Sequence, residues 1–377
     1  MSSRAAAILV LEDGRAFRGE AYGSVGESFG EAVFNTGMTG YQETLTDPSY
    51  YGQVVCQTAP QIGNTGWNDE DDESGRIWVS GYVVRDPSRI ASNWRARRGL
   101  EDELAAQGVV GICGVDTRAL TRHLRGCGAM RAGLSSRSTD VDELLAKVRS
   151  APRMAGANHI GAVTTAEPYT CEAEGETKYT VAALDLGIKR NTPRRLAARG
   201  VTTTVHPAGA TVDQILAEDP DAVFLSNGPG DPATADHQVE LTRELLRRRI
   251  PVFGICFGNQ ILGRALGLST YKLKHGHRGI NQPVLDRLTG KVEITTHNHG
   301  FALAAPESGE YFETEFGRVR ISHLSLNDNV VEGLTCLDVP AYSVQYHPEA
   351  ASGTHDADYL FDRLTALIEA EGASPDA

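Results

Sequence analysis

The chain has 377 residues, of which 41% are hydrophobic and 23% are charged, and its formal net charge at pH 7 is −13. This length suits two domains that each bury a core, and the composition excludes a disordered or fibrous protein. The negative charge repels nucleic-acid phosphates and anionic lipid, and no cluster of Lys and Arg offsets it, so we expect no nucleic acid and no membrane among the partners.

Residues 1–150 are predicted to form a β-rich α/β domain. The apolar run at 5–11 leads into an Asp-Gly hairpin signal, so we interpret it as a first strand and not as a targeting segment. No stretch is long enough to span a bilayer, and the six cysteines lack paired spacing, so we expect a cytoplasmic protein with reduced thiols. Further strand-like runs lie at 31–36 and 51–59, and helix-like periodicity lies at 115–126 and 139–150.

Periodicity fades over residues 151–178, where small, polar and turn residues dominate, and we interpret this segment as a linker or a tethering arm. From 179 to 373 the pattern becomes regular, because short apolar runs alternate with amphipathic helical stretches up to about residue 267. This alternation predicts a doubly wound, mostly parallel sheet covered by helices on both faces. Further strands are expected at 276–286, 291–300, 322–334 and 340–349, and a closing helix at 356–370.

Cys256 stands at the centre of the sequence Gly-Ile-Cys-Phe-Gly, residues 254–258, between an apolar strand and a helical stretch. This is the pattern of a nucleophile elbow, in which flanking glycines allow a strained turn that exposes the central side chain. A thiol at the start of a helix is also favoured as the thiolate, the form that attacks. The alternative is a tight turn with two small residues and no chemistry.

A nucleophile of this kind needs a base and a group that orients the base. His347 follows an apolar strand, and Glu349 projects to the same side if the segment is extended, as Pro348 favours. A surface His beside a surface Glu is the alternative interpretation.

The loop at 225–232, Leu-Ser-Asn-Gly-Pro-Gly-Asp-Pro, can turn backbone N–H groups outward to hold an oxyanion. It also matches a loose dinucleotide fingerprint, but the next strand does not end in the acidic residue that would bind a ribose. Two histidine pairs at i, i+2 suggest a metal, yet no Cys or carboxylate stands at ligand spacing beside them, so we expect polar lining and no metal site. These pairs are His275 with His277 and His297 with His299.

These motifs, together with Asn-His-Gly-Phe at 298–301, resemble the class I glutamine amidotransferases. Three motifs of the N-terminal half and the domain junction, at 33–55, 114–125 and 183–191, are similar to the small, glutamine-hydrolysing subunit of carbamoyl-phosphate synthetase. The resemblance covers nearly the whole chain. It implies a ligase of the glutamine amidotransferase type, active in arginine and pyrimidine biosynthesis.

The resemblance also implies the residue roles. Cys256 would attack the glutamine carboxamide, His347 would act as base and then acid, Glu349 would orient it, and water would hydrolyse the glutamyl thioester. The backbone N–H groups of Gly228 and Phe257 would form the oxyanion hole. The residues expected to hold glutamine are Ser49, Gly228, Gly230, Phe257, Gln260, Asn298, Gly300 and Phe301.

The same resemblance implies a heterodimer with a large subunit, docked through residues 1–150, and it leaves higher-order oligomers open. Ammonia would pass under cover to that subunit, which would use ATP, Mg and bicarbonate to make carbamoyl phosphate; no cofactor is expected in this chain. Three positions depart from the common family pattern: Phe257, Asn259, which we expect to alter how the pocket closes, and Tyr346, which adds bulk beside His347.

Two other functions stay open at this point. A cysteine-type α/β-hydrolase also uses an elbow, and Asp338 would then supply its acid. A silent regulatory subunit would keep the elbow only as a relic, although Cys256, His347 and Glu349 are all present.

Overall fold

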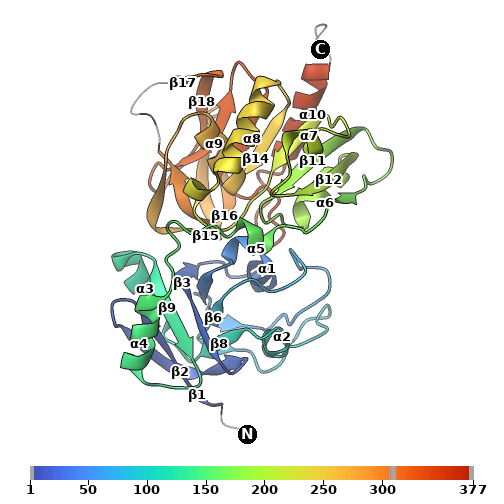
Figure 1. The fold of residues 1–377 in the computed structure, drawn as a ribbon. Helices are drawn as coiled ribbons and strands as arrows, with labels where there is room; N and C mark the ends of the chain where they lie inside the picture. Colours follow the sequence, from blue (N-terminus) through green and yellow to red (C-terminus); the bar gives the residue numbers. More distant parts are fainter. Residues whose placement is uncertain (1–3, 305, 307–310, 373–377) are drawn as a thin grey trace. The chain divides into compact units, whose positions relative to one another are not determined.

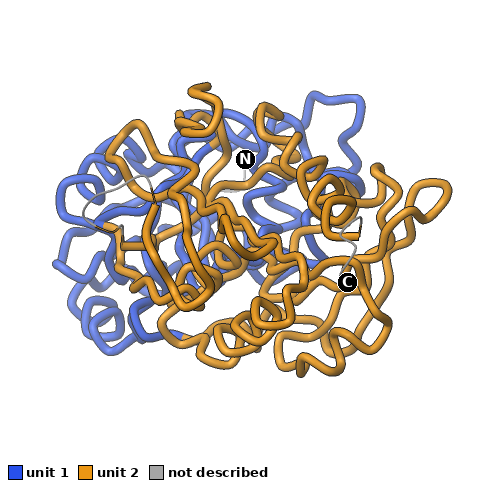
Figure 2. Tube along the Cα trace, turned by 90° about the horizontal axis from the view of Figure 1, so that it is seen from above, with its two compact units in different colours: residues 1–157, 274–279 blue, residues 158–273, 280–377 orange. Residues whose placement is uncertain are grey.

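The computed structural model describes residues 4–304, 306 and 311–372. Contacts group the chain into unit 1, residues 1–157 and 274–279, and unit 2, residues 158–273 and 280–377 (Figure 2). The predicted boundaries at 150 and 178 stay predictions, and the predicted ends at 1 and 373 lie outside the described residues. Over the part of the chain that is described, no helix is both long and apolar enough to cross a membrane.

Unit 1 is built on a closed barrel with the strand order β1-β2-β8-β6-β4-β3-β9 (Figure 1). The barrel strands are β1 (Ala6–Leu11), β2 (Ala16–Gly23), β3 (Glu27–Asn35), β4 (Gln53–Gln57), β6 (Gly81–Val83), β8 (Val110–Cys113) and β9 (Met130–Ser135), and β5 (Gln61–Ile62) pairs with β7 (Asp86–Pro87) beside them. The helices are α1 (Tyr41–Thr46), η1 (Pro48–Tyr50), α2 (Leu100–Ala106), α3 (Thr117–Cys127) and α4 (Val141–Ser150).

The apolar run of β1 is explained by burial on both faces of the strand. Leu9 lies in one core cluster with Leu120 and Leu124 of α3, whereas Ile8 lies in another with Val148 of α4. Strand side chains alternate between faces, so a strand covered on both sides is apolar throughout. The first strand predicted for this domain is therefore confirmed, as are its two later helices.

Unit 2 contains an eleven-stranded sheet with the order β10-β12-β11-β13-β14-β20-β19-β18-β15-β16, and β17 pairs with β18. Its strands are β10 (Tyr169–Cys171), β11 (Tyr179–Asp185), β12 (Val201–Pro207), β13 (Ala222–Leu225), β14 (Val252–Ile255), β15 (Thr270–Asp286), β16 (Val292–Leu303), β17 (Tyr311–Thr314), β18 (Gly317–Ser325), β19 (Val331–Cys336) and β20 (Ala341–Val344). Its helices are α5 (Ile160–Val163), α6 (Asn191–Ala197), α7 (Val212–Ile215), η2 (Pro232–Thr234), α8 (Asp236–Arg247), α9 (Phe257–Ala265) and α10 (Tyr359–Gly372).

Helices cover both faces of this sheet, as the doubly wound prediction requires. Along β13, Val223 packs into the core that contains helix residues of α8 and α9, and Phe224 packs into the core that contains those of α6 and α10. The strands from β12 to β20 in the sheet order pair in parallel, whereas β18 and β19 add antiparallel pairs. The predicted α/β fold class is confirmed, with the parallel part confined to the middle of the sheet.

The segment interpreted as a linker contains regular structure. Residues 169–171 form β10, an edge strand that pairs antiparallel with β12, and α5 precedes it. Three residues are too few for a period to be visible in sequence, and the pairing itself supplies the stability of such a strand.

Candidate active site

Cys256 lies in a strained turn between β14 and α9. Its φ and ψ are 56° and −99°, a backbone conformation that non-glycine residues rarely adopt. A Cβ on Gly254 would lie 2.7 Å from the carbonyl oxygen of Gly258, and a Cβ on Gly258 would lie 2.1 Å from the carbonyl oxygen of Leu225. Both glycines are therefore required by close backbone approach, as the elbow pattern predicts.

The expectation of an exposed thiol is wrong for this structure. Cys256 is 2% exposed, and its Sγ donates a hydrogen bond to the backbone oxygen of Asn298, 3.6 Å away on β16. The local pattern around a turn does not show which distant strand covers it, so sequence alone could not reveal this burial.

His347 and Glu349 lie just beyond the end of β20 and contact each other. Nδ1 of His347 lies 2.7 Å from Oε1 of Glu349, and both residues are buried. Burial by itself would raise the pKa of Glu349, but the charges of Lys189 and His347 and their hydrogen bonds outweigh it and lower this pKa to about 2. Glu349 is therefore ionised and only accepts, so the imidazole proton is on Nδ1 and Nε2 keeps its lone pair. That Nε2 is buried and has no hydrogen-bond partner among the described residues.

Lys189 is a site residue that the sequence analysis did not identify. Its Nζ lies 2.7 Å from Oε1 of Glu349, and its side chain is 7% exposed. The turn that leads to it is shaped by Asp185 at the end of β11, whose Oδ1 accepts from the backbone N–H groups of Gly187 and Ile188 at 2.9 and 2.8 Å. A lysine four residues after the carboxyl end of a parallel strand was the signal that could have identified it.

The thiol and the imidazole lie at the same end of two neighbouring strands. β14 and β20 run in parallel with Ile255 opposite Val344, and the N–H of Cys256 donates to Val344 at 2.8 Å. Strand β16 contacts both residues, because Thr296 accepts from the N–H of His347 at 2.8 Å and Asn298 accepts from the thiol. Side chains at the carboxyl ends of adjacent parallel strands face one crevice.

The loop after β13 packs against the loop after β11. A Cβ on Gly228 would lie 2.1 Å from the carbonyl oxygen of Leu186, and the Asn227 side chain donates to the carbonyl of Gly187 at 2.8 Å. At the start of α9, the N–H of Phe257 belongs to the first turn, whose donors have no intrahelical acceptor. The roles of Gly228 and Phe257 in an oxyanion hole stay predictions.

The remaining residues expected to hold glutamine are placed as follows. Gln260 is buried on α9, and its Nε2 donates to the carbonyl of Phe301 at 2.8 Å and to Gln345 at 3.0 Å. Asn298, Gly300 and Phe301 lie on β16, and Gly230 lies in the loop before η2. Ser49 lies in unit 1, buried within η1. Their roles in binding stay predictions.

Two of the three side chains that depart from the family pattern, those of Asn259 and Tyr346, form hydrogen bonds within unit 2. Asn259 donates to Gln345 at 3.1 Å and accepts from Ser343 at 2.9 Å, so its amide binds the end of β20. Tyr346 is fully buried, and its hydroxyl donates to Glu293 at 3.4 Å. Their predicted effects on the pocket and on His347 stay predictions.

Asp338 does not serve as the acid of an α/β-hydrolase triad in this structure. It precedes β20, whereas His347 follows that strand, and it forms an exposed ion pair with Arg318 at 2.8 Å. His347 instead contacts Glu349, so the hydrolase alternative is not supported.

Comparisons with known proteins agree with this geometry. The family "Carbamoyl-phosphate synthase small chain, CPSase domain" matches residues 9–134, and "Glutamine amidotransferase class-I" matches residues 182–367. The carbamoyl phosphate synthase small chain of Streptomyces avermitilis is 65% identical over 374 residues, which cover 99% of this chain and 98% of the relative. The small chain of Streptomyces coelicolor is 66% identical to this chain, and the match covers 98% of each. The small chain of Mycobacterium tuberculosis is 61% identical, and the match covers 97% of this chain and 99% of the relative.

The α/β sheet, the strained cysteine turn and the family match over 182–367 define a class I glutamine amidotransferase domain. Full-length identity then narrows the assignment: the chain belongs to the carbamoyl phosphate synthase small chain family. The family predicted from the sequence motifs is confirmed, and so is the predicted enzyme class.

Proposed function

We propose that Cys256, His347 and Glu349 hydrolyse the side-chain amide of L-glutamine to glutamate and ammonia. The observation that carries the proposal is the 2.7 Å contact between His347 and the ionised Glu349, which leaves Nε2 as a base at the strand end where the cysteine turn lies.

In the first half of the reaction, the thiol turns from Asn298 and gives its proton to Nε2 of His347, and the sulfur attacks the amide carbon. Negative charge develops on the amide oxygen, where the N–H groups of Gly228 and Phe257 would stabilise it. The imidazolium then protonates the leaving nitrogen, the C–N bond breaks, and ammonia and a glutamyl thioester result. Glu349 stabilises the imidazolium but keeps its own charge, since its pKa lies far below neutral.

In the second half, water attacks the thioester and gives one proton to Nε2. The C–S bond breaks, the sulfur takes the proton back, and glutamate leaves. Each cycle restores the thiol and the neutral imidazole, so the chain itself supplies all proton transfers and needs no redox partner.

Lys189 fits this proposal as a positioning residue. Its ammonium compensates the charge of the buried Glu349 carboxylate. The Oε1 atom of Glu349 accepts from both the Lys189 ammonium and the His347 imidazole. The remaining predicted residues, Ser49, Gly230, Gln260, Asn298, Gly300 and Phe301, would hold the glutamine.

The proposal includes a large synthetase subunit as the partner that receives the ammonia. Ammonia is mostly protonated at neutral pH and is then no nucleophile, so its delivery requires a docked partner. Residues 1–150 are proposed to form the docking surface, and the use of ATP and bicarbonate is assigned to that partner. The family to which the chain belongs supports this arrangement.

The test uses the chain reconstituted with its large subunit. Cys256→Ala is expected to abolish carbamoyl phosphate synthesis from glutamine and to leave synthesis from ammonium salts intact. Wild-type glutamate release is expected to rise when the large subunit, ATP and bicarbonate are added. Equal loss of the glutamine-fed and ammonia-fed reactions in Cys256→Ala would refute the proposed role of the thiol.

A further inference from the structure

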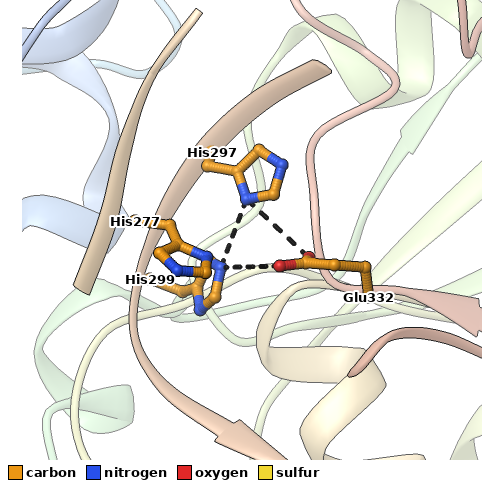
Figure 3. A group of neighbouring side chains, drawn as sticks. All are labelled: His277, His297, His299 and Glu332. Atoms are coloured by element: carbon orange, nitrogen blue, oxygen red, sulfur yellow. Dashed lines mark hydrogen bonds and ion pairs between the residues drawn. The ribbon is translucent and has the colours of Figure 1, made fainter. Parts of the chain in front are cut away.

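Strand β16 carries a second polar cluster, on the residues that flank Asn298. His297 and His299 project to the same face of the strand, and Glu332 approaches them from β19 (Figure 3). The side chains are 1%, 1% and 0% exposed. Nδ1 of His297 lies 3.3 Å from Nε2 of His299, and each of these nitrogens lies 3.7 Å from one oxygen of Glu332.

The tautomer of His299 follows from its other ring nitrogen. Nδ1 lies 2.9 Å from the backbone oxygen of Phe301, which can only accept a hydrogen bond. Nδ1 therefore carries the proton. In the neutral ring, Nε2 presents a lone pair to the cluster.

The tautomer of His297 follows in the same way through Thr295. The Thr295 hydroxyl donates its only proton to the backbone oxygen of Gln282 at 2.8 Å, so toward His297 it acts as an acceptor. Nε2 of His297, 2.8 Å from that hydroxyl, is then the donor. Nδ1 accordingly presents its lone pair to the cluster.

Two nitrogen lone pairs and a carboxylate thus converge in a buried space, an arrangement that a bound cation would stabilise. A proton shared by the two rings would form a hydrogen bond across the 3.3 Å between their nitrogens. It would form none with Glu332, because the 3.7 Å from each nitrogen to a carboxylate oxygen exceeds hydrogen-bond distance. Zinc with bonds of about 2.0–2.1 Å in tetrahedral geometry spaces its ligand atoms about 3.3–3.4 Å apart. All three separations lie within about 0.4 Å of that spacing. Imidazole also favours zinc, copper, iron or nickel over magnesium or calcium.

We propose that the chain binds one divalent transition-metal ion, with zinc the best fit, through His297 Nδ1, His299 Nε2 and the Glu332 carboxylate. The contacts of Phe301 and Thr295 hold the remote ring nitrogens, as oxygen acceptors do around metal-bound histidines. His277, also labelled in Figure 3, lies in the part of β15 grouped with unit 1, and the proposal does not depend on it. This proposal differs from the expectation of no metal site that was drawn from the sequence.

Such an ion would fix the backbone that contacts the proposed catalytic residues. Thr296 and Asn298, on either side of His297, accept from the N–H of His347 and from the Cys256 thiol. The metal would therefore act as an ordering element of β16 and would take no part in bond making. The metal proposal stands independently of the proposed glutaminase activity.

The test measures metal content and does not rely on activity. The full chain is produced in zinc-supplemented medium, passed over a chelating resin and analysed by mass spectrometry of its metals; about one zinc per chain is expected. His297→Gln and Glu332→Gln are each expected to lose it, with an affinity about 100-fold weaker or more. Circular dichroism verifies folding. The milder variant Thr295→Val removes the hydroxyl that accepts from His297 and donates to Gln282, and it should weaken zinc binding about 10-fold.

The control addresses the second group of possible ligands among the described residues, Asp13, His123 and Cys127 in unit 1. His123→Asn should leave the zinc content unchanged. Cobalt substitution should give visible d–d bands without a sulfur-to-cobalt charge-transfer band. Zinc that disappears in His123→Asn but persists in His297→Gln, a cobalt–sulfur band, or a wild-type chain without zinc would each overturn the proposal.

Discussion

Lys189→Met tests whether the buried ion pair with Glu349 holds the proposed base in place. Nζ and Oε1 are 2.7 Å apart, and their side chains are 7% and 0% exposed, so solvent does not screen the pair. The pKa of Glu349 falls from 4.5 to about 2 against the opposing effect of burial. At about 1.36 kcal/mol per pKa unit, this corresponds to about 3 kcal/mol of stabilisation of the carboxylate by its surroundings.

Removing one partner of a buried pair leaves the other charge uncompensated and costs about 3–5 kcal/mol. We expect Lys189→Met to lower the free energy of unfolding by about 3 kcal/mol in urea titrations at pH 7. In a Glu349→Gln background the same substitution removes a lone buried charge, so it should not lower the free energy of unfolding and should restore part of the stability that Glu349→Gln loses. The exposed Lys291→Met serves as the control and should stay within about 0.5 kcal/mol of wild type.

The pH dependence gives a second readout. A carboxyl group whose folded pKa is depressed contributes stability above its unfolded pKa and loses it as pH falls toward the folded value. The cost of Lys189→Met should therefore be constant from pH 6 to 8 and shrink from about pH 4.5 toward pH 2, where Glu349 protonates. An equal cost of Lys189→Met in both backgrounds, or a cost that does not depend on pH, would refute this reasoning.

Three further predictions concern the turn, the base and the first unit. Gly258→Ala should lower the free energy of unfolding by about 3 kcal/mol or more, since its Cβ would lie 2.1 Å from a backbone oxygen. Gly161 has open space around the position of a Cβ, so Gly161→Ala should leave the free energy of unfolding unchanged, and urea titration compares the two variants. Glu349→Gln should reduce glutamate release by about 10³–10⁴-fold, because His347 loses the acceptor that sets its tautomer, and an unchanged rate would contradict the triad. Burial raises the pKa of Glu43 to about 7, so this group stabilises the fold below about pH 4.5 and loses that contribution as pH rises through 7. Because Glu43 is partly exposed to solvent, we expect Glu43→Gln to raise the free energy of unfolding, relative to wild type, by only about 1–2 kcal/mol more at pH 8 than at pH 5. The same difference from wild type at both pH values would contradict this.

The elements that sequence predicts well are those whose signals are local. The apolar sequence of β13 reflects two covered faces, and Gly254 reflects a close approach to Gly258 within one strand–turn–helix unit. His347 and Glu349 are two residues apart, so an extended backbone alone brings them to one side. Each of these features needs no knowledge of distant strands.

The features that sequence does not reveal depend on partners far along the chain. Lys189 meets Glu349 across 160 positions, and Glu332 meets His297 from another strand of the sheet. The burial of Cys256 follows from its contact with Asn298 of β16, which lies 42 positions later in the chain. Such contacts are set by strand order, and strand order carries no period or turn signal of its own.

The position of β16 explains why one strand influences both halves of the proposed chemistry. Two kinds of residue alternate along this strand. The backbone oxygens of Thr296 and Asn298 accept from His347 and from the Cys256 thiol, and the side chains of His297 and His299 form the buried cluster. A strand has two faces and a fixed two-residue repeat, so a constraint on the histidine face also fixes the backbone atoms between them. Disorder in the cluster would therefore shift the acceptors of Cys256 and His347 together, and a cation that orders the cluster would preserve their spacing.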